Sequence, residues 1–137
     1  MIILVDTSVW SLVLRRKAGA LNSAERIIVH DWTKIVKEGR ACLIGPIKQE
    51  ILSGIKHENE FNKIAEYLAN FDEVAIESID FEQAARFFNK LRVTGIVATP
   101  IDLMIAAVSY RLNYEIFTTD PDFKHYAPRL PIRLHVT

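Results

Sequence analysis

The chain has 137 residues, of which 50% are hydrophobic and 25% are charged, a composition typical of a folded domain. Its 17 basic and 17 acidic side chains cancel, which argues against binding nucleic acid by bulk charge but does not exclude a nuclease with a local basic rim. Cys42 is the single cysteine, and no apolar run approaches the roughly 20 residues of a membrane span. Without a signal-peptide pattern, we expect one cytoplasmic domain over residues 1–137.

The first strand is predicted over residues 2–5, a continuous apolar run of the kind that parallel sheets bury on both faces. Asp6 follows at its carboxyl end, which is the edge where open α/β sheets bind ligands. A helix is predicted directly afterwards, so Asp6 or Ser8 taken alone is more simply explained as a helix cap. The functional interpretation depends on which other residues reach the same edge.

Further strands and helices alternate along the chain. Ser23 is predicted to cap the second helix, and the basic residues 15–17 to form a turn at the end of the first. The helix around residues 81–91 is predicted to face the core through Phe81, Ala84, Ala85, Phe88 and Leu91. We expect strands over 41–44, 74–76, 114–118 and 132–136, and helices over 23–39, 45–54, 61–68, 81–91 and 99–112. This order predicts an α/β fold, a three-layer α/β/α sandwich with a mostly parallel sheet.

Four acids lie at strand-to-helix junctions: Asp6, Glu50, Asp102 and Asp120. Each also has an ordinary structural explanation. Glu50 fits an exposed helix position, Asp102 fits a capping box begun by Thr99, and Asp120 precedes a proline that favours a turn. If the first, second and fourth strands are parallel neighbours, all four acids can meet in one cleft.

Clustered carboxylates without basic partners repel one another, so they need protons or a cation. Carboxylate and water oxygens suit Mg²⁺ or Mn²⁺, which can activate water and neutralise charge on a phosphate. The four histidines have no zinc-ligand spacing. Neither a glycine-rich phosphate loop nor a Ser-His-Asp arrangement is present in the sequence.

The chain resembles the PIN-domain ribonucleases, and within them the VapC-type toxins of toxin–antitoxin pairs. The matching segments, in order, are Leu4-Val5-Asp6-Thr7-Ser8, Glu50-Ile51-Leu52-Ser53-Gly54, Asp102-Leu103-Met104-Ile105-Ala106-Ala107 and Thr118-Thr119-Asp120-Pro121-Asp122-Phe123. The resemblance implies a PIN-like α/β/α sandwich that cleaves RNA with Mg²⁺ or Mn²⁺. It also implies a homodimer that is inhibited by a cognate VapB-type antitoxin. By motif position, the metal-binding and catalytic residues would be Asp6, Glu50, Asp102 and Asp120, with Thr118 and Asp122 as auxiliary residues.

Two other functions stay open at this stage. An aspartyl-phosphate phosphatase or receiver also places an Asp after its first strand, but a phosphatase of that type would have a second acid where this chain has Ser8. A non-catalytic module that binds a partner would have no need of four acids at one edge. Metal-dependent cleavage of RNA distinguishes all three.

Overall fold

The computed structural model describes residues 1–15 and 18–137 and contains a five-stranded sheet in the order β3-β2-β1-β4-β5. All four strand pairs are parallel, and Leu4 of β1 lies between Cys42 of β2 and Ile116 of β4. The strands are β1 (Ile3–Val5), β2 (Ala41–Ile44), β3 (Asp72–Val74), β4 (Glu115–Phe117) and β5 (Arg133–Leu134). The predicted parallel neighbours of the first strand are confirmed.

Seven α-helices connect these strands in the described part of the chain, with one short 3₁₀ helix, η1 (Ala18–Ala20). Arg16 and Lys17, which belong to the predicted basic turn, lie outside the described residues. No helix in the described ranges has the length and apolar character needed to cross a membrane. The helices are α1 (Thr7–Arg15), α2 (Ser23–Lys37), α3 (Gly45–Leu52), α4 (Glu58–Leu68), α5 (Ser78–Val93), α6 (Pro100–Leu112) and α7 (Asp122–Tyr126).

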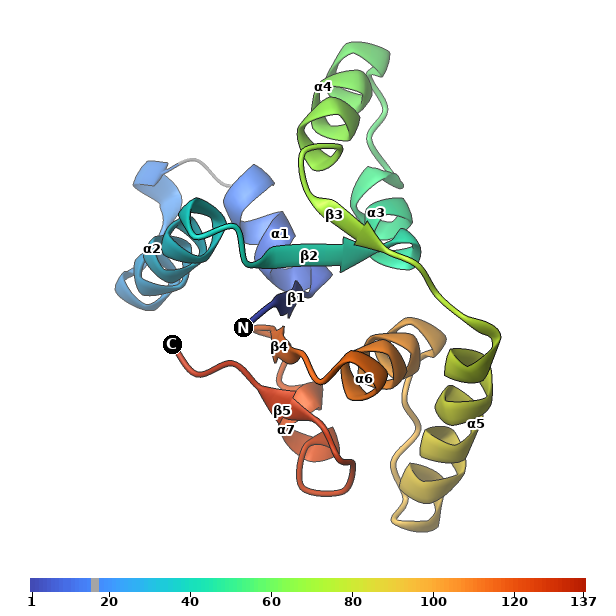
Figure 1. The fold of residues 1–137 in the computed structure, drawn as a ribbon. Helices are drawn as coiled ribbons and strands as arrows, with labels where there is room; N and C mark the ends of the chain where they lie inside the picture. The colour runs from blue at the N-terminus through green and yellow to red at the C-terminus, as the bar shows by residue number, and fades with distance from the viewer. Residues whose placement is uncertain (16–17) are drawn as a thin grey trace.

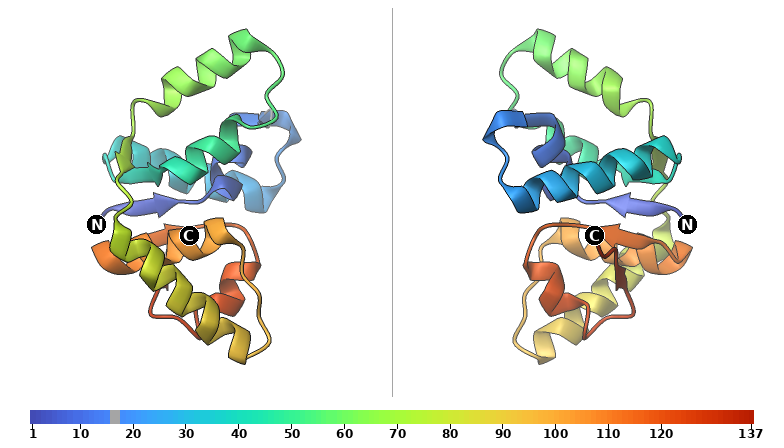
Figure 2. Two further views of the ribbon diagram at one scale, coloured as in Figure 1. Left: turned by 90° about the vertical axis from the view of Figure 1, so that its right-hand side faces the viewer. Right: turned by 90° about the vertical axis from the view of Figure 1, so that its left-hand side faces the viewer.

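The strands that follow β1 fill the sheet first on one side of β1 and then on the other. The chain runs outward from β1 to β2 and β3, and then reverses to reach β4 and β5 on the other side of β1. Because such parallel crossovers are right-handed, the reversal places α1 to α4 on one face and α5 to α7 on the other. Figures 1 and 2 show these two groups of helices on either side of β1. The predicted α/β/α sandwich is confirmed, and its topological switch point, where ligands bind in such sheets, lies between β1 and β4.

The core explains why β1 is the central strand. Ile3, Leu4 and Val5 have no solvent exposure, as expected for an apolar run covered on both faces. Trp10 is also fully buried, and its indole Nε1 donates a 3.0 Å hydrogen bond to the carbonyl of Val5. This contact fixes the start of α1 against the end of β1, which positions the intervening Asp6.

Several predicted boundaries were wrong by a few residues. Asn22, rather than Ser23, is the N-cap of α2, and it forms a reciprocal capping box with Glu25. The third strand covers Asp72–Val74 instead of residues 74–76, because it pairs with Cys42–Ile44 in that register. The fourth strand is shorter than predicted, and the last strand is reduced to two residues.

The predicted core-facing stripe of α5 was also partly wrong. Phe81 is 60% exposed and Ala85 is exposed, whereas Phe87, which the stripe omitted, is buried and contacts the ring of Tyr110. Leu91 is fully buried as predicted. The helix packs mainly against α6 rather than against the sheet, so a different face is buried from the one that its apolar spacing suggested.

Candidate metal centre

Asp6 is held at the switch point by hydroxyl groups from two elements. Its backbone N–H donates to the carbonyl of Phe117 in β4, at 2.8 Å. Its carboxylate Oδ2 accepts hydrogen bonds from Ser8 Oγ of α1 and from Thr118 Oγ1 at the end of β4, both at 2.8 Å. The side chain is therefore fixed by the end of β4 as well as by its own helix.

Thr118 connects Asp6 to the next acid. Its hydroxyl donates to Asp6 and accepts a 3.0 Å hydrogen bond from the backbone N–H of Asp120. Asp120 in turn accepts a 2.9 Å hydrogen bond from the N–H of Asp122 through Oδ1, which forms the turn that leads into α7. The turn predicted at Asp120 is thus present, and it points the carboxylates of Asp120 and Asp122 toward the same place.

Asp102 reaches the site from the first turn of α6. Thr99 caps this helix by accepting a 3.2 Å hydrogen bond from the N–H of Asp102, as predicted. The Asp102 carboxylate does not complete the predicted capping box; its Oδ2 instead accepts a 2.9 Å hydrogen bond from the hydroxyl of Tyr126 in α7. The acid is consequently directed into the site and away from its own helix end.

Three of these acids form a compact cluster. Carboxylate oxygens of Asp102, Asp120 and Asp122 all lie within 4.8 Å of one another. Burial raises the pKa of Asp102 to about 6, and the nearby charges of Asp6 and Asp120 contribute to the rise. The hydrogen bond from Tyr126 opposes it. The Thr118 hydroxyl, which is hydrogen-bonded to both Asp6 and the N–H of Asp120, places Asp6 next to the cluster.

The pKa of Asp6 is also raised. Burial is the main cause, and the hydrogen bonds from Ser8 and Thr118 oppose it. Asp6 is only 5% exposed and Asp102 only 8% exposed, so two carboxyl groups are removed from water at one point. Such an arrangement is costly for charged carboxylates unless a cation joins them.

Glu50 does not belong to this cluster. It is exposed on α3, which begins directly after β2 and therefore at the same edge of the sheet. Among the described residues, the group of acids within 4.8 Å of one another contains Asp122 and does not contain Glu50. The structure thus brings together Asp102, Asp120 and Asp122 beside Asp6, and a role for Glu50 stays a prediction.

Two residues of the site were not recognised in the sequence as part of it. Ser8 was predicted as a possible helix cap and belongs to the first matching segment, but neither it nor Tyr126 was predicted to hold an acid of the site. The spacing of Ser8, two residues after Asp6 at the start of a helix, is a usable signal. The contact of Tyr126 with Asp102 joins residues 24 positions apart, so it follows only from the packing of α7 beside α6.

The donor set fits a hard divalent cation. All the converging groups are oxygens, and no histidine or cysteine belongs to the cluster within the described residues. In the same part of the chain, no lysine or arginine forms an ion pair with these acids. Carboxylate oxygens with accompanying water are the usual ligands of Mg²⁺ and Mn²⁺. Asp102, Asp120, Asp122 and Asp6 are the residues that could hold such an ion.

An acidic cluster at the switch point of a parallel sheet defines the class of this protein as an α/β domain with a candidate cation site. A family model for the PIN domain matches residues 3–128, most of the chain. The chain belongs to the PIN domain family. This confirms the family that the four sequence segments indicated.

Solved structures agree with this fold. The chain is similar to one in VapBC2 from Rickettsia felis bound to a DNA fragment from their promoter, with 17% identity, a TM-score of 0.76 and 98% of each chain covered. FitAcB from Neisseria gonorrhoeae gives 18% identity and a TM-score of 0.76, covering 98% of this chain and 97% of the other. DNA-bound VapBC from Salmonella typhimurium gives 13% identity and a TM-score of 0.73, with the same coverage. A comparison with curated protein sequences finds no significant match.

Proposed function

We propose that this protein is a metal-dependent endoribonuclease and the toxin of a VapBC-type toxin–antitoxin pair. The observation that carries the proposal is the cluster of Asp102, Asp120 and Asp122 oxygens within 4.8 Å of one another, beside the buried Asp6. Membership of the PIN domain family supports a nuclease. Mg²⁺, or Mn²⁺ in its place, would supply an activated water and neutralise charge that develops on the phosphodiester.

The chain's own residues would bind and orient this ion. Ser8 and Thr118 hold Asp6 through short hydrogen bonds, and Tyr126 holds Asp102, so both carboxylates are oriented before an ion arrives. Such support from surrounding hydrogen bonds typically changes metal affinity or activity 10–100-fold. We include Glu50 in the site, since its helix begins at the same sheet edge and its side chain is exposed.

The proposed partners are RNA, an antitoxin and a second copy of this chain. We propose a cytoplasmic protein in which residues 1–137 form one domain. The similar structures from Rickettsia felis and Salmonella typhimurium are VapBC proteins bound to DNA, which supports a VapB-type antitoxin as the partner. A metal centre at the end of a sheet also offers a direct way to inhibit the toxin, because a bound segment could cover the acids.

The test is cleavage of mixed cellular RNA by the purified chain in Mg²⁺, Mn²⁺ or EDTA, followed by sequencing of the new RNA ends. We expect cleavage only with metal, leaving 5′-phosphate and 3′-hydroxyl ends. Asp6→Asn should be inactive. Metal-independent cleavage, or an Asp6→Asn protein as active as the wild type, would overturn the proposal. Expression with and without an adjacent reading frame tests the toxin–antitoxin part separately.

A further inference from the structure

A pocket of about 760 Å³ adjoins the metal centre and is larger than that centre requires. Ser8, Thr118 and Asp120 line it, so it adjoins the acid cluster at Asp120. Its volume lies within the roughly 300–1,000 Å³ of small-molecule sites in proteins. The pocket therefore offers space for a substrate group attached to the phosphate that reacts at the acids.

The walls of the pocket away from the acids are largely apolar. Leu12 comes from α1, Ile28 comes from α2, and Leu134 and Val136 come from the last segment of the chain. Polar side chains, among them Glu25 and Lys124, line the rest of the pocket. Apolar walls with a few polar groups suit a flat, uncharged ring that carries hydrogen-bonding edges.

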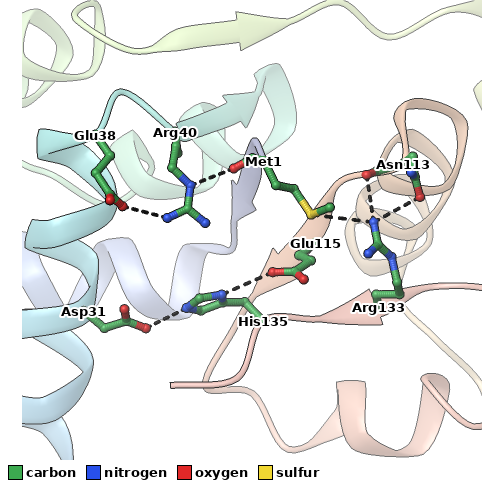
Figure 3. A network of polar contacts seen from close by, with 8 residues as sticks. All are labelled: Met1, Asp31, Glu38, Arg40, Asn113, Glu115, Arg133 and His135. Carbon is green, nitrogen blue, oxygen red and sulfur yellow. Dashed lines mark hydrogen bonds and ion pairs between the residues drawn. The ribbon is translucent and has the colours of Figure 1, made fainter.

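The wall made by the last segment is held in place by His135. The backbone N–H of His135 donates to the carbonyl of Ile116, at 2.8 Å. Its ring lies between two carboxylates, with Nε2 2.6 Å from Asp31 of α2 and Nδ1 3.3 Å from Glu115 of β4 (Figure 3). The ring also packs against Phe117, with 4.9 Å between centroids. Contacts with α2 and β4 make this wall a fixed part of the site.

We propose that this pocket binds the base of an unpaired nucleotide next to the phosphodiester that is cleaved. The inference rests on the proposed ribonuclease function. A base is uncharged, so it can occupy a pocket in which apolar side chains lie beside one lysine and two acids, Glu25 and Asp120. It can enter only when it is splayed out of a helix, which is how proteins read single-stranded RNA loops. The substrate is therefore single-stranded at this position.

The test begins with a short RNA that the wild-type protein cleaves, in which each nucleotide around the cut is replaced in turn by an abasic residue. We expect one position at which kcat/KM falls about tenfold, in the range that base stacking contributes to single-strand binding. Binding of the same RNAs in EDTA, followed by fluorescence anisotropy, should weaken by a similar factor. This second measurement does not require a working metal centre.

Ala24→Phe connects the effect to the pocket, because Ala24 is an exposed residue of α2 that lines it. The larger ring should occupy the base site. We expect kcat/KM to fall about tenfold on intact RNA and to stay unchanged on the abasic RNA, since two changes that remove one contact are not additive. Ala85→Phe is the matched control, an exposed helical alanine on α5, and it should cleave both RNAs like the wild type. Val136→Asp, in a side chain that is 85% exposed, provides a second variant if Ala24→Phe melts abnormally.

Two results would overturn the inference while leaving the ribonuclease intact. One is an RNA in which no abasic position affects cleavage or binding. The other is an Ala24→Phe protein that cleaves intact RNA normally but fails to bind a coexpressed antitoxin, which would make the pocket a peptide site. If the wild type cleaves no RNA and binds intact and abasic RNA equally, both proposals fail together.

Discussion

Asp102→Asn separates a metal ligand from a helix cap, because the two roles predict opposite changes in stability. The pKa of Asp102 is raised from 3.8 to about 6, first by burial and further by the charges of Asp6 and Asp120. Below 3.8 the folded and unfolded chains are both protonated. As the pH rises to about 6, the unfolded chain loses its proton first, so the free energy of unfolding falls. The two pKa values differ by about two, and each pKa unit corresponds to about 1.4 kcal/mol, so the free energy of unfolding falls by about 3 kcal/mol.

We therefore expect Asp102→Asn to stabilise the metal-free protein at neutral pH by up to about 3 kcal/mol. For a chain of this length, that is a rise in melting temperature of up to about 12 °C. Mg²⁺ at a hundredfold excess over Kd should stabilise the wild type by about 2.7 kcal/mol. The variant should lose most of this gain. If Asp102 only capped α6, its loss would instead cost roughly 0.3–1 kcal/mol and leave the Mg²⁺ response unchanged.

The measurement is thermal unfolding of both proteins at about pH 4, 6 and 7.5 in EDTA or Mg²⁺. The difference between the two proteins should widen as the pH rises through this range. Asp80→Asn is the control, since Asp80 is 1% exposed and hydrogen bonds from Arg111 and the backbone of Glu77 lower its pKa against the effect of burial. Its replacement should lower the melting temperature at neutral pH and leave the Mg²⁺ shift unchanged. An Asp102→Asn protein that melts below the wild type in EDTA and keeps the full Mg²⁺ shift would refute the reasoning.

The other predictions concern catalysis, support of the site, stability and assembly. Asp6→Asn and Glu50→Gln should each abolish RNA cleavage without changing the circular dichroism spectrum. Thr118→Val, which removes the donor to Asp6, should reduce metal affinity or activity about 10–100-fold, whereas Thr118→Ser should retain most of both. Arg111→Ala leaves Asp80 buried without its bidentate partner, so it should cost about 3 kcal/mol in denaturant unfolding and leave the Mg²⁺ shift unchanged. In light scattering the purified chain should have the mass of a homodimer, and a monomer that recovers no antitoxin from its host would contradict this prediction.

Local sequence signals were sufficient for the central part of the fold. The apolar runs at β1 and β2 could be recognised because they are buried on both faces, and a strand of that kind has little alternative in an α/β domain. The face of α5 could not be recognised in the same way. Its burial depends on contact with α6, so Phe87 became a core residue and Phe81 did not. Where a helix packs against another helix, apolar spacing alone does not determine the buried face.

The candidate site could also be predicted only in part from local sequence signals. Asp6, Asp102 and Asp120 could be selected from the sequence because each follows a strand or begins a helix at the carboxyl edge. Their mutual distances could not be predicted, since these depend on β4 returning beside β1 after the long crossover through α5 and α6. Tyr126 was missed for this reason as well, because α7 approaches α6 only in the folded chain.

The cap and metal-site interpretations of Asp6 describe two properties of one residue. Its carbonyl accepts hydrogen bonds from the N–H groups of Val9 and Trp10, so Asp6 does begin α1. The side-chain bond that would complete the cap, from the N–H of Ser8, is long at 3.4 Å. The short bonds instead come from two hydroxyls, and one of them belongs to Thr118, which is 112 positions away at the end of β4. A helix cap needs no partner from another strand, and it gives no reason to keep a carboxyl buried beside other acids at the cost of a raised pKa. A cation shared with those acids would offset that cost, so the strand-to-strand hydrogen bond favours the metal site as the reason for this geometry.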